Sequence, residues 1–163
     1  RDARITTIYE GTTAIQANDL IGRKIAREQG ATINWVIGEM RTAAAGLDGD
    51  LAVIGTRQLA AVDALERAVL WIVANFGSDP KAVHAGAVPF LHLFGIVAGG
   101  WQMGRAAVIA RTRIAAGDGD PFWPAKLATT RFFADHFLTQ AAGLAESVVA
   151  GAAGALEIAD DSF

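Results

Sequence analysis

The sequence has 163 residues, and its 14 Lys and Arg against 17 Asp and Glu give a net charge of −3. This length corresponds to one domain, and a composition that is 52% hydrophobic and 19% charged is typical of a folded chain and excludes a disordered one. The absence of Cys excludes disulfides, thiolate metal sites and cysteine nucleophiles, and the mild acidity argues against a nucleic-acid surface. The 34 Ala, beside only one Tyr, predict an all-α fold, because Ala has the highest helix propensity.

The first residues, Arg1-Asp-Ala-Arg-Ile, include no initiator Met and no apolar signal-peptide core, so we expect a piece of a longer protein. After an irregular lead-in, Thr12 or Thr13 is predicted to cap a first helix that runs to about Gln29. Gly30 then provides a left-handed stop.

Two amphipathic helices are predicted next, over residues 32–46 and 51–76. Each carries an apolar stripe with alternating spacings of three and four residues, which is the period of a helix with one buried face. The stripes consist of Ile33, Ile37, Met40, Ala44 and Leu47 in the first helix and of Val62, Leu65, Val69, Ile72 and Phe76 in the second. Asp63 and Arg67 stand four residues apart on the polar side of the second helix and predict an ion pair within it.

The clearest helix boundary follows at residues 77–80. Gly77 predicts the C-terminal end of one helix, and Asp79 and Pro80 predict the cap and first residue of the next. That fourth helix extends to about residue 116, and Pro89 should kink it or separate its first turns.

The last long helix is predicted after a Gly- and Pro-rich break at residues 117–124, and it extends to about residue 150. Its apolar stripe consists of Ala134, Phe137, Ala141, Leu144 and Val148. Striped helices joined by short loops predict an antiparallel bundle of about five helices.

Residues 85–104 are uncharged and long enough to span a bilayer. They contain five Gly, of which two pairs, Gly95/Gly99 and Gly100/Gly104, have the GxxxG spacing that suits close helix packing. We interpret this stretch as a central helix that its amphipathic neighbours bury, and not as a membrane span.

The other residue types that can take part in catalysis or binding are interpreted as structural here. His84 and His92 lie eight residues apart on one predicted helix, about 12 Å along its axis, and no His pair has metal-ligand spacing, so we predict no metal site. The Gly-rich stretches lack the Lys and the preceding strand of a phosphate-binding loop, and we interpret them as packing and turn glycines. The four Trp are interpreted as core or interface aromatics: Trp35, Trp71, Trp101 and Trp123.

One N-terminal segment differs from the bundle pattern, because it places Glu10 among apolar and hydroxyl side chains, followed by Gly11 and a helix start. A carboxylate in an apolar setting has a raised pKa and can act as a general base near neutral pH. The N–H groups of the helix start can receive an anion or a carbonyl. From the residues alone, Glu10 is either such a base or an ordinary helix-capping residue.

The segment from Arg1-Asp-Ala-Arg-Ile to Ile-Tyr-Glu-Gly-Thr-Thr-Ala-Ile-Gln resembles the RDAxI…IYEGTxxIQ signature of flavin-dependent acyl-CoA dehydrogenases. Residues 19–24, 91–101 and 126–138 resemble the long members of that family, of the 3-methylmercaptopropionyl-CoA dehydrogenase type, which carry an extra C-terminal helical domain. The resemblance therefore covers essentially the whole chain.

The resemblance implies that Glu10 is the base that removes the α-proton of an acyl thioester while a hydride leaves the β-carbon for the flavin. It implies substrate contacts at Gly11 and, one position out of register, at Arg23. It also implies FAD contacts at Thr12, Thr13 and Ala14, the last of which departs from the Gln of many members.

On this resemblance we expect residues 1–30 to end a catalytic helical domain and residues 31–163 to form a C-terminal helical extension. The parent would be a cytoplasmic, homo-oligomeric enzyme of fatty-acid oxidation that desaturates an acyl-CoA and passes electrons to an electron-transfer flavoprotein or a similar acceptor. The fragment alone would be inactive and would not bind FAD, because the domains that hold flavin and substrate lie upstream of it. The alternative is a non-catalytic helical module for oligomerisation or interaction, with residues 85–104 and the last helix in the subunit contact.

Overall fold

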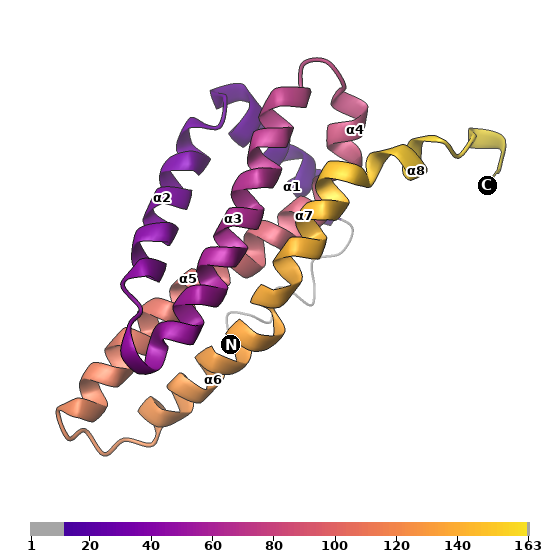
Figure 1. Cartoon of the computed structure of the whole chain (residues 1–163). Coiled ribbons are helices and arrows are strands. Elements are labelled where there is room, and N and C mark those ends of the chain that lie inside the picture. Colours follow the sequence, from indigo (N-terminus) through magenta and orange to yellow (C-terminus); the bar gives the residue numbers. More distant parts are fainter. Residues whose placement is uncertain (1–11, 163) are drawn as a thin grey trace.

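A computed structural model describes residues 12–162, which form helices joined by short turns with no β-strand among them (Figure 1). The predicted all-α class is therefore confirmed. The α-helices are α1 (Thr13–Asp19), α2 (Ala31–Ala45), α3 (Ala52–Asn75), α4 (Pro80–Ala85), α5 (Ala87–Ala115), α6 (Phe122–His136), α7 (Ala141–Ala150) and α8 (Ala152–Leu156). A π-helix spans Leu20–Ile25, and short 3₁₀ turns span Ala26–Glu28, Gly49–Leu51, Leu138–Gln140 and Asp160–Ser162.

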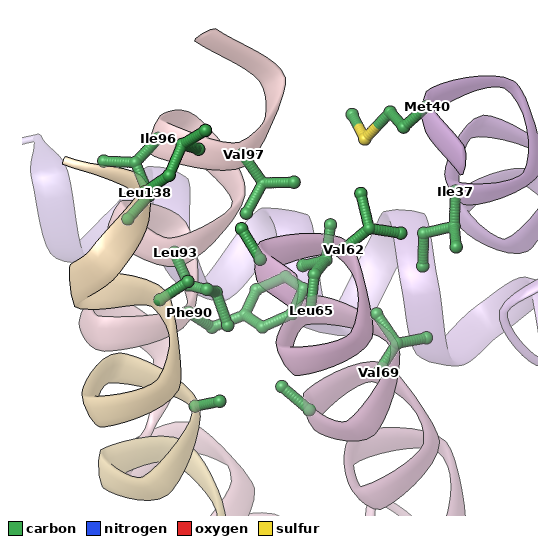
Figure 2. Packing of buried hydrophobic residues seen from close by; sticks show 14 of the residues in the cluster. Ile37, Met40, Val62, Leu65, Val69, Phe90, Leu93, Ile96, Val97 and Leu138 are labelled. Carbon is green, nitrogen blue, oxygen red and sulfur yellow. The ribbon is translucent and has the colours of Figure 1, made fainter. Parts of the chain in front are cut away.

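The long helices pack side by side, and α3 lies in the middle of the bundle. It contacts α2 on one side and α5, α6 and α7 on the other, whereas α8 extends away from the bundle (Figure 1). In the core, Val62, Leu65 and Val69 of α3 lie between Ile37 and Met40 of α2 and the α5 side chains (Figure 2). The α5 contribution consists of Phe90, Leu93, Ile96 and Val97.

The apolar stripes predicted for α2 and α3 are confirmed. All five stripe residues of α2 and its following turn are buried. In α3 the stripe is buried from Val62 to Ile72, and Phe76 at its end is half-buried. Removing one such side chain from water contributes roughly 1.5–3 kcal/mol, so these two stripes account for much of the stability of the bundle.

The first helix differs from its prediction, because only its first seven residues form α-helix and a π-helix and a 3₁₀ turn follow. Ala17, Ile21 and Ile25 are buried at intervals of four residues. These three side chains therefore form one buried face across the change of helix type. Gly30 ends the segment with a φ of 77°, as predicted, and Gln29 before it is also left-handed with a φ of 52°.

The predicted fourth helix is divided into α4 and α5, in agreement with the expected effect of Pro89. Asp79 caps α4 by accepting a hydrogen bond from the Ala82 N–H at 3.0 Å, and Pro80 is its first residue. The break falls at Gly86, where an added Cβ would lie 3.1 Å from the Val148 carbonyl oxygen of α7. Gly86 therefore lets the chain turn where α7 passes closely.

The prediction of one continuous last helix is wrong, because a 3₁₀ turn at Leu138–Gln140 separates α6 from α7. At this turn the Thr139 and Gln140 side chains donate to the carbonyl oxygens of Asp135 and His136. The break changes the register of the stripe, so that Phe137 is 38% exposed and Leu138 is buried in its place.

The ion pair predicted between Asp63 and Arg67 is also wrong. Asp63 instead accepts from Arg41 of α2 at 2.6 Å, and Arg67 pairs with Glu146 of α7 at 2.9 Å. The neighbouring helices bring these partners closer than the next turn of α3 does. Trp35 is 67% exposed on α2, so of the two predicted roles, core or interface, it does not have the core one.

The close helix approach predicted for α5 at Gly99 and Gly100 is confirmed. An added Cβ on Gly99 would lie 3.0 Å from Phe133 Cζ of α6. An added Cβ on Gly100 would collide with the Gln58 side chain of α3 and lie 2.6 Å from Leu138 Cδ2. Small residues at these points let α3, α6 and the turn after α6 pack directly on the α5 backbone.

By length and composition, α5 is the one helix within residues 12–162 that could cross a membrane. Core helices pass the same test, and α5 contacts α1, α2, α3, α6 and α7. Its Phe90, Leu93 and Val97 side chains are fully buried. These contacts favour the interpretation of α5 as a central helix of the bundle.

Candidate functional site

Two of the residues that the sequence singles out for catalysis, Glu10 and Gly11, lie outside the described residues. The described part of the candidate site begins at Thr12, which is half-buried and precedes the first turn of α1. The Thr12 side chain makes no hydrogen bond that caps the helix, so its hydroxyl is not committed to α1. Thr13 and Ala14 are exposed in the first turn.

Arg23 lies in the π-helix, one turn beyond α1. Its side chain is 77% exposed, and its guanidinium pairs with the Asp19 carboxylate at 3.1 Å. An exposed pair at this spacing contributes little to stability and is easily exchanged for another anion. Arg23 can therefore contact an anionic group at the surface, but the structure does not bring it into a pocket with the Thr12 segment.

One polar contact near this segment was not anticipated from the sequence. The Asn18 Oδ1 of α1 lies 3.0 Å from His84 Nδ1 of α4, and the His84 ring meets the Phe76 ring edge-on at 5.7 Å. These contacts tie the N-terminal helix to the bundle. The partners are 66 residues apart, so no short-range pattern could have signalled them.

The three His are on different helices, with His84 on α4, His92 on α5 and His136 on α6. The expectation that His84 and His92 share one helix is wrong, because the break at Gly86 separates them. Among residues 12–162, no group of three or more His, Cys, Asp or Glu is placed to hold a metal ion.

A charged cluster lies at the opposite turn, before α3. Arg111 of α5 donates to Asp48 at 2.7 Å and to Asp50 at 3.3 Å. The hydrogen bond from Arg111 holds the pKa of Asp48 below its ordinary value. This pair fastens the α2–α3 turn to α5, and its role is structural.

The fit to FAD can be judged from Thr12, Thr13 and Ala14. They offer a hydroxyl and backbone N–H groups at a helix start, which are groups that suit a phosphate or a flavin edge. Two of the three, Thr13 and Ala14, are exposed. These residues can contribute to the edge of a flavin site but do not enclose one.

The fold is a helical domain, and comparison with known proteins identifies its family. A family model described as "Acetyl-CoA dehydrogenase C-terminal like" matches residues 36–159, and the chain belongs to this family. The chain is 44% identical over 144 residues to the 3-methylmercaptopropionyl-CoA dehydrogenase of Ruegeria pomeroyi, covering 86% of this chain and 24% of that protein. It is 33% identical over 149 residues to the broad-specificity linear acyl-CoA dehydrogenase FadE5 of Mycobacterium tuberculosis, covering 85% of this chain and 24% of that protein.

The resemblance identified from the sequence is thus confirmed at the level of the family. The chain spans about a quarter of the length of these two relatives. The helical domain therefore corresponds to one part of each of these two longer dehydrogenases.

Proposed function

We propose that this chain is the C-terminal part of an FAD-dependent acyl-CoA dehydrogenase, which introduces a double bond between the α- and β-carbons of an acyl-CoA thioester. The observation that carries the proposal is the IYEGT segment at residues 8–12, followed along the chain by the family match over residues 36–159. The names of both relatives, which are acyl-CoA dehydrogenases, support the same reaction class.

In this proposal Glu10 removes the α-proton of the thioester. Its backbone N–H polarises the thioester carbonyl, which stabilises the negative charge that develops there, and Gly11 borders the substrate. Bound FAD would supply the hydride acceptor for the β-carbon. Thr12, Thr13 and Ala14 contribute polar groups at the start of α1, and Arg23 contributes a cation for an anionic part of the CoA.

We further propose that residues 1–30 complete the catalytic helical domain and residues 31–163 form the extension. On that division the 163-residue chain alone is inactive, because the family holds flavin and substrate with further domains and the chain spans only about a quarter of its relatives. An electron-transfer flavoprotein or a similar acceptor, a cytoplasmic location and a homo-oligomeric parent belong to the same proposal. The family membership of the chain supports them.

The test is the absorbance of the intact parent. The purified protein should be yellow, and its flavin absorbance should bleach when an acyl-CoA is added without an electron acceptor. A panel of acyl-CoA thioesters of different chain lengths would then define the substrate. A colourless parent, or a yellow one that no acyl-CoA bleaches, would contradict the proposed reaction.

A second candidate function is an oligomerisation module, which exposed aromatic side chains on α6 and the following turn favour. Phe132 is 54% exposed and Phe137 is 38% exposed, and their rings lie 6.1 Å apart. Gly100 and Gly104 are buried within the chain, so this part of α5 is already occupied. A Phe132→Ser chain that sediments as a smaller species than the native chain would support the module, and unchanged sedimentation would contradict it.

A further inference from the structure

The N-terminal helical segment, residues 12–30, packs on the rest of the bundle with one continuous buried face. Ala17 and Ile21 are fully buried, and Ile25 is 1% exposed. The helix α1 contacts α5, and the π-helix that follows it contacts α2 and α3. These three helices all belong to residues 31–163, so the proposed extension provides the surface on which the end of the proposed catalytic domain lies.

A polar contact lies at the edge of this buried face. The Asn18 Oδ1 of α1 is 3.0 Å from the His84 Nδ1 of α4. An amide oxygen can only accept a hydrogen bond, so Nδ1 is the nitrogen that carries the proton and donates. The His84 ring in turn meets the ring of Phe76, the residue after α3, edge-on at an interplanar angle of 67°. The aromatic contact restricts the orientation of the His84 ring.

The π-helix lies against the same two rings. An added Cβ on Gly22 would lie 3.6 Å from Phe76 Cζ and 4.0 Å from His84 Cε1. The rings therefore pack beside the backbone of the π-helix, with no side chain of Gly22 between them. Because Asn18 and Gly22 are four residues apart, α4 and the end of α3 contact two successive turns of the N-terminal segment.

The apolar and polar contacts constrain the N-terminal segment in different ways. Apolar packing is not directional, so it permits a short helix to slide or rotate by small amounts on its neighbours. A hydrogen bond depends strongly on distance and angle. The bond between Asn18 and His84 thus fixes the rotation and the axial position of α1. Residues 12–14 at the start of α1 are four to six residues before Asn18, which corresponds to about 6–9 Å along the helix axis.

The start of α1 is where the proposed chemistry requires accurate placement. Thr13 and Ala14 are exposed there, and the Thr12 hydroxyl makes no bond that caps the helix. In the sequence, Glu10 precedes Thr12 by two residues. A general base must stand within hydrogen-bond reach of the proton that it removes. A displacement of about 1 Å, caused by a change far from the reacting atoms, can cost on the order of 100-fold in rate.

We propose that His84 is a positioning residue for the dehydrogenation. Its hydrogen bond to Asn18, with the Phe76 ring and the Gly22 backbone beside it, holds the start of α1 in the orientation that the catalytic segment needs. His84 acts through Asn18 and α1, and not as an acid or a base. This inference rests on the proposed function, and it gives the C-terminal extension a part in the geometry of the active site.

The test is rapid mixing of the intact parent with saturating acyl-CoA, for the native enzyme and a His84→Ala variant. The variant should bleach its flavin roughly 10- to 100-fold more slowly, because the base is displaced. The acyl-CoA concentration that gives half the maximal bleaching rate should change by no more than about 2-fold, because substrate binding is retained. A purely structural role of His84 predicts a lower melting temperature with a native rate of bleaching.

Three further variants separate the hydrogen bond from other effects. His84→Asn keeps an N–H group near the position of Nδ1 and should restore most of the native rate. Asn18→Ala should slow bleaching as much as His84→Ala does, and the double variant should be no slower than either single one, because both remove the same bond. His136→Ala is the matched control, since His136 is also exposed but lies on α6, where its ring stacks on Phe132. It should bleach at the native rate.

A His84→Ala parent that bleaches at the native rate would overturn this proposal and leave the proposed function intact. A His84→Asn parent as slow as the His84→Ala parent would overturn it as well, because the hydrogen bond would then not be the cause. A native parent that no acyl-CoA bleaches would contradict the proposed function and this inference with it. If the His84→Ala parent fails to fold, the Asn18→Ala parent gives the same comparison, and a native rate there would overturn the proposal.

Discussion

A Gly100→Ala substitution tests the packing of α5 most sharply, and Gly95→Ala on the same helix is its matched control. A Cβ at Gly95 meets nothing within 4 Å. A Cβ at Gly100 would collide with Gln58 and lie 2.6 Å from Leu138 Cδ2, and both of those side chains are buried, at 1% and 3% exposure. Neither neighbour can move into solvent to make room.

Both substitutions gain helix propensity, because Ala is favoured over Gly by about 0.5–1 kcal/mol inside a helix. Gly95→Ala should therefore stabilise the chain by about that amount. At Gly100 the same gain is opposed by overpacking, which typically costs about 1–3 kcal/mol. The difference between the two variants should be close to the overpacking cost alone.

Scanning calorimetry of the two chains measures this difference. A change of 1 kcal/mol shifts Tm by roughly 2–4 °C in a domain of this size, so Gly100→Ala should melt roughly 2–12 °C below Gly95→Ala. Equal melting temperatures would refute the reasoning, because they would show that Gln58 and Leu138 leave room for a methyl group at Gly100.

Three further predictions follow from single contacts. Leu65→Ala should cost about 2–5 kcal/mol in urea unfolding, because Leu65 is fully buried at the centre of the core; a cost under 1 kcal/mol would contradict its central position. Asp79→Ala should cost about 0.5–2 kcal/mol through loss of the bond to the Ala82 N–H, measured in the same way, and no loss would show that α4 forms without its cap. Arg111→Gln should raise the pKa of Asp48 toward its ordinary value, because the hydrogen bond from Arg111 lowers it. An NMR pH titration measures this pKa, and an unchanged midpoint would show that another group lowers it. Because that pKa is lowered in the folded chain, the favourable contribution of Asp48 is present at neutral pH and is lost as the pH falls through the folded-state pKa.

The helices of the bundle could be predicted from the sequence because their signals are local. The stripe of α2 from Ile33 to Ala44 repeats with the helical period, and Asp79 and Pro80 occupy adjacent cap positions. Each of these features is determined within a few turns of chain.

The errors have a common cause, which is that a distant element decides the outcome. Arg67 has an acidic residue one turn away on its own helix, yet Glu146 of α7 is the group that reaches it. The division of the last helix at Leu138–Gln140 is likewise not encoded in the apolar periodicity. After Ala134 the stripe contains Ala and Phe, which do not determine which face of the helix is buried. Packing against the other helices buries Leu138 in the core.

The same distinction applies to the sites. The IYEGT segment could be identified from the sequence because its residues are contiguous, and it points to Glu10 without any knowledge of the fold. The contact between Gln58 and Gly100 could not be, because these residues are 42 positions apart and neither belongs to a motif. Only the packing of α3 against α5 brings the Gln58 amide against the Gly100 backbone.

The proposed role of Glu10 is tested most directly by rapid mixing of a Glu10→Gln variant of the intact parent with an acyl-CoA. Gln keeps the size of the side chain and the backbone N–H but cannot accept the α-proton. The account predicts normal flavin content and normal acyl-CoA binding, with flavin bleaching slowed by at least the ~10²–10⁴-fold typical of a lost general base. A variant that bleaches at the native rate would contradict the role of Glu10 as the base. If that variant also lost at most about 1 kcal/mol of stability, Glu10 would be a helix-capping residue.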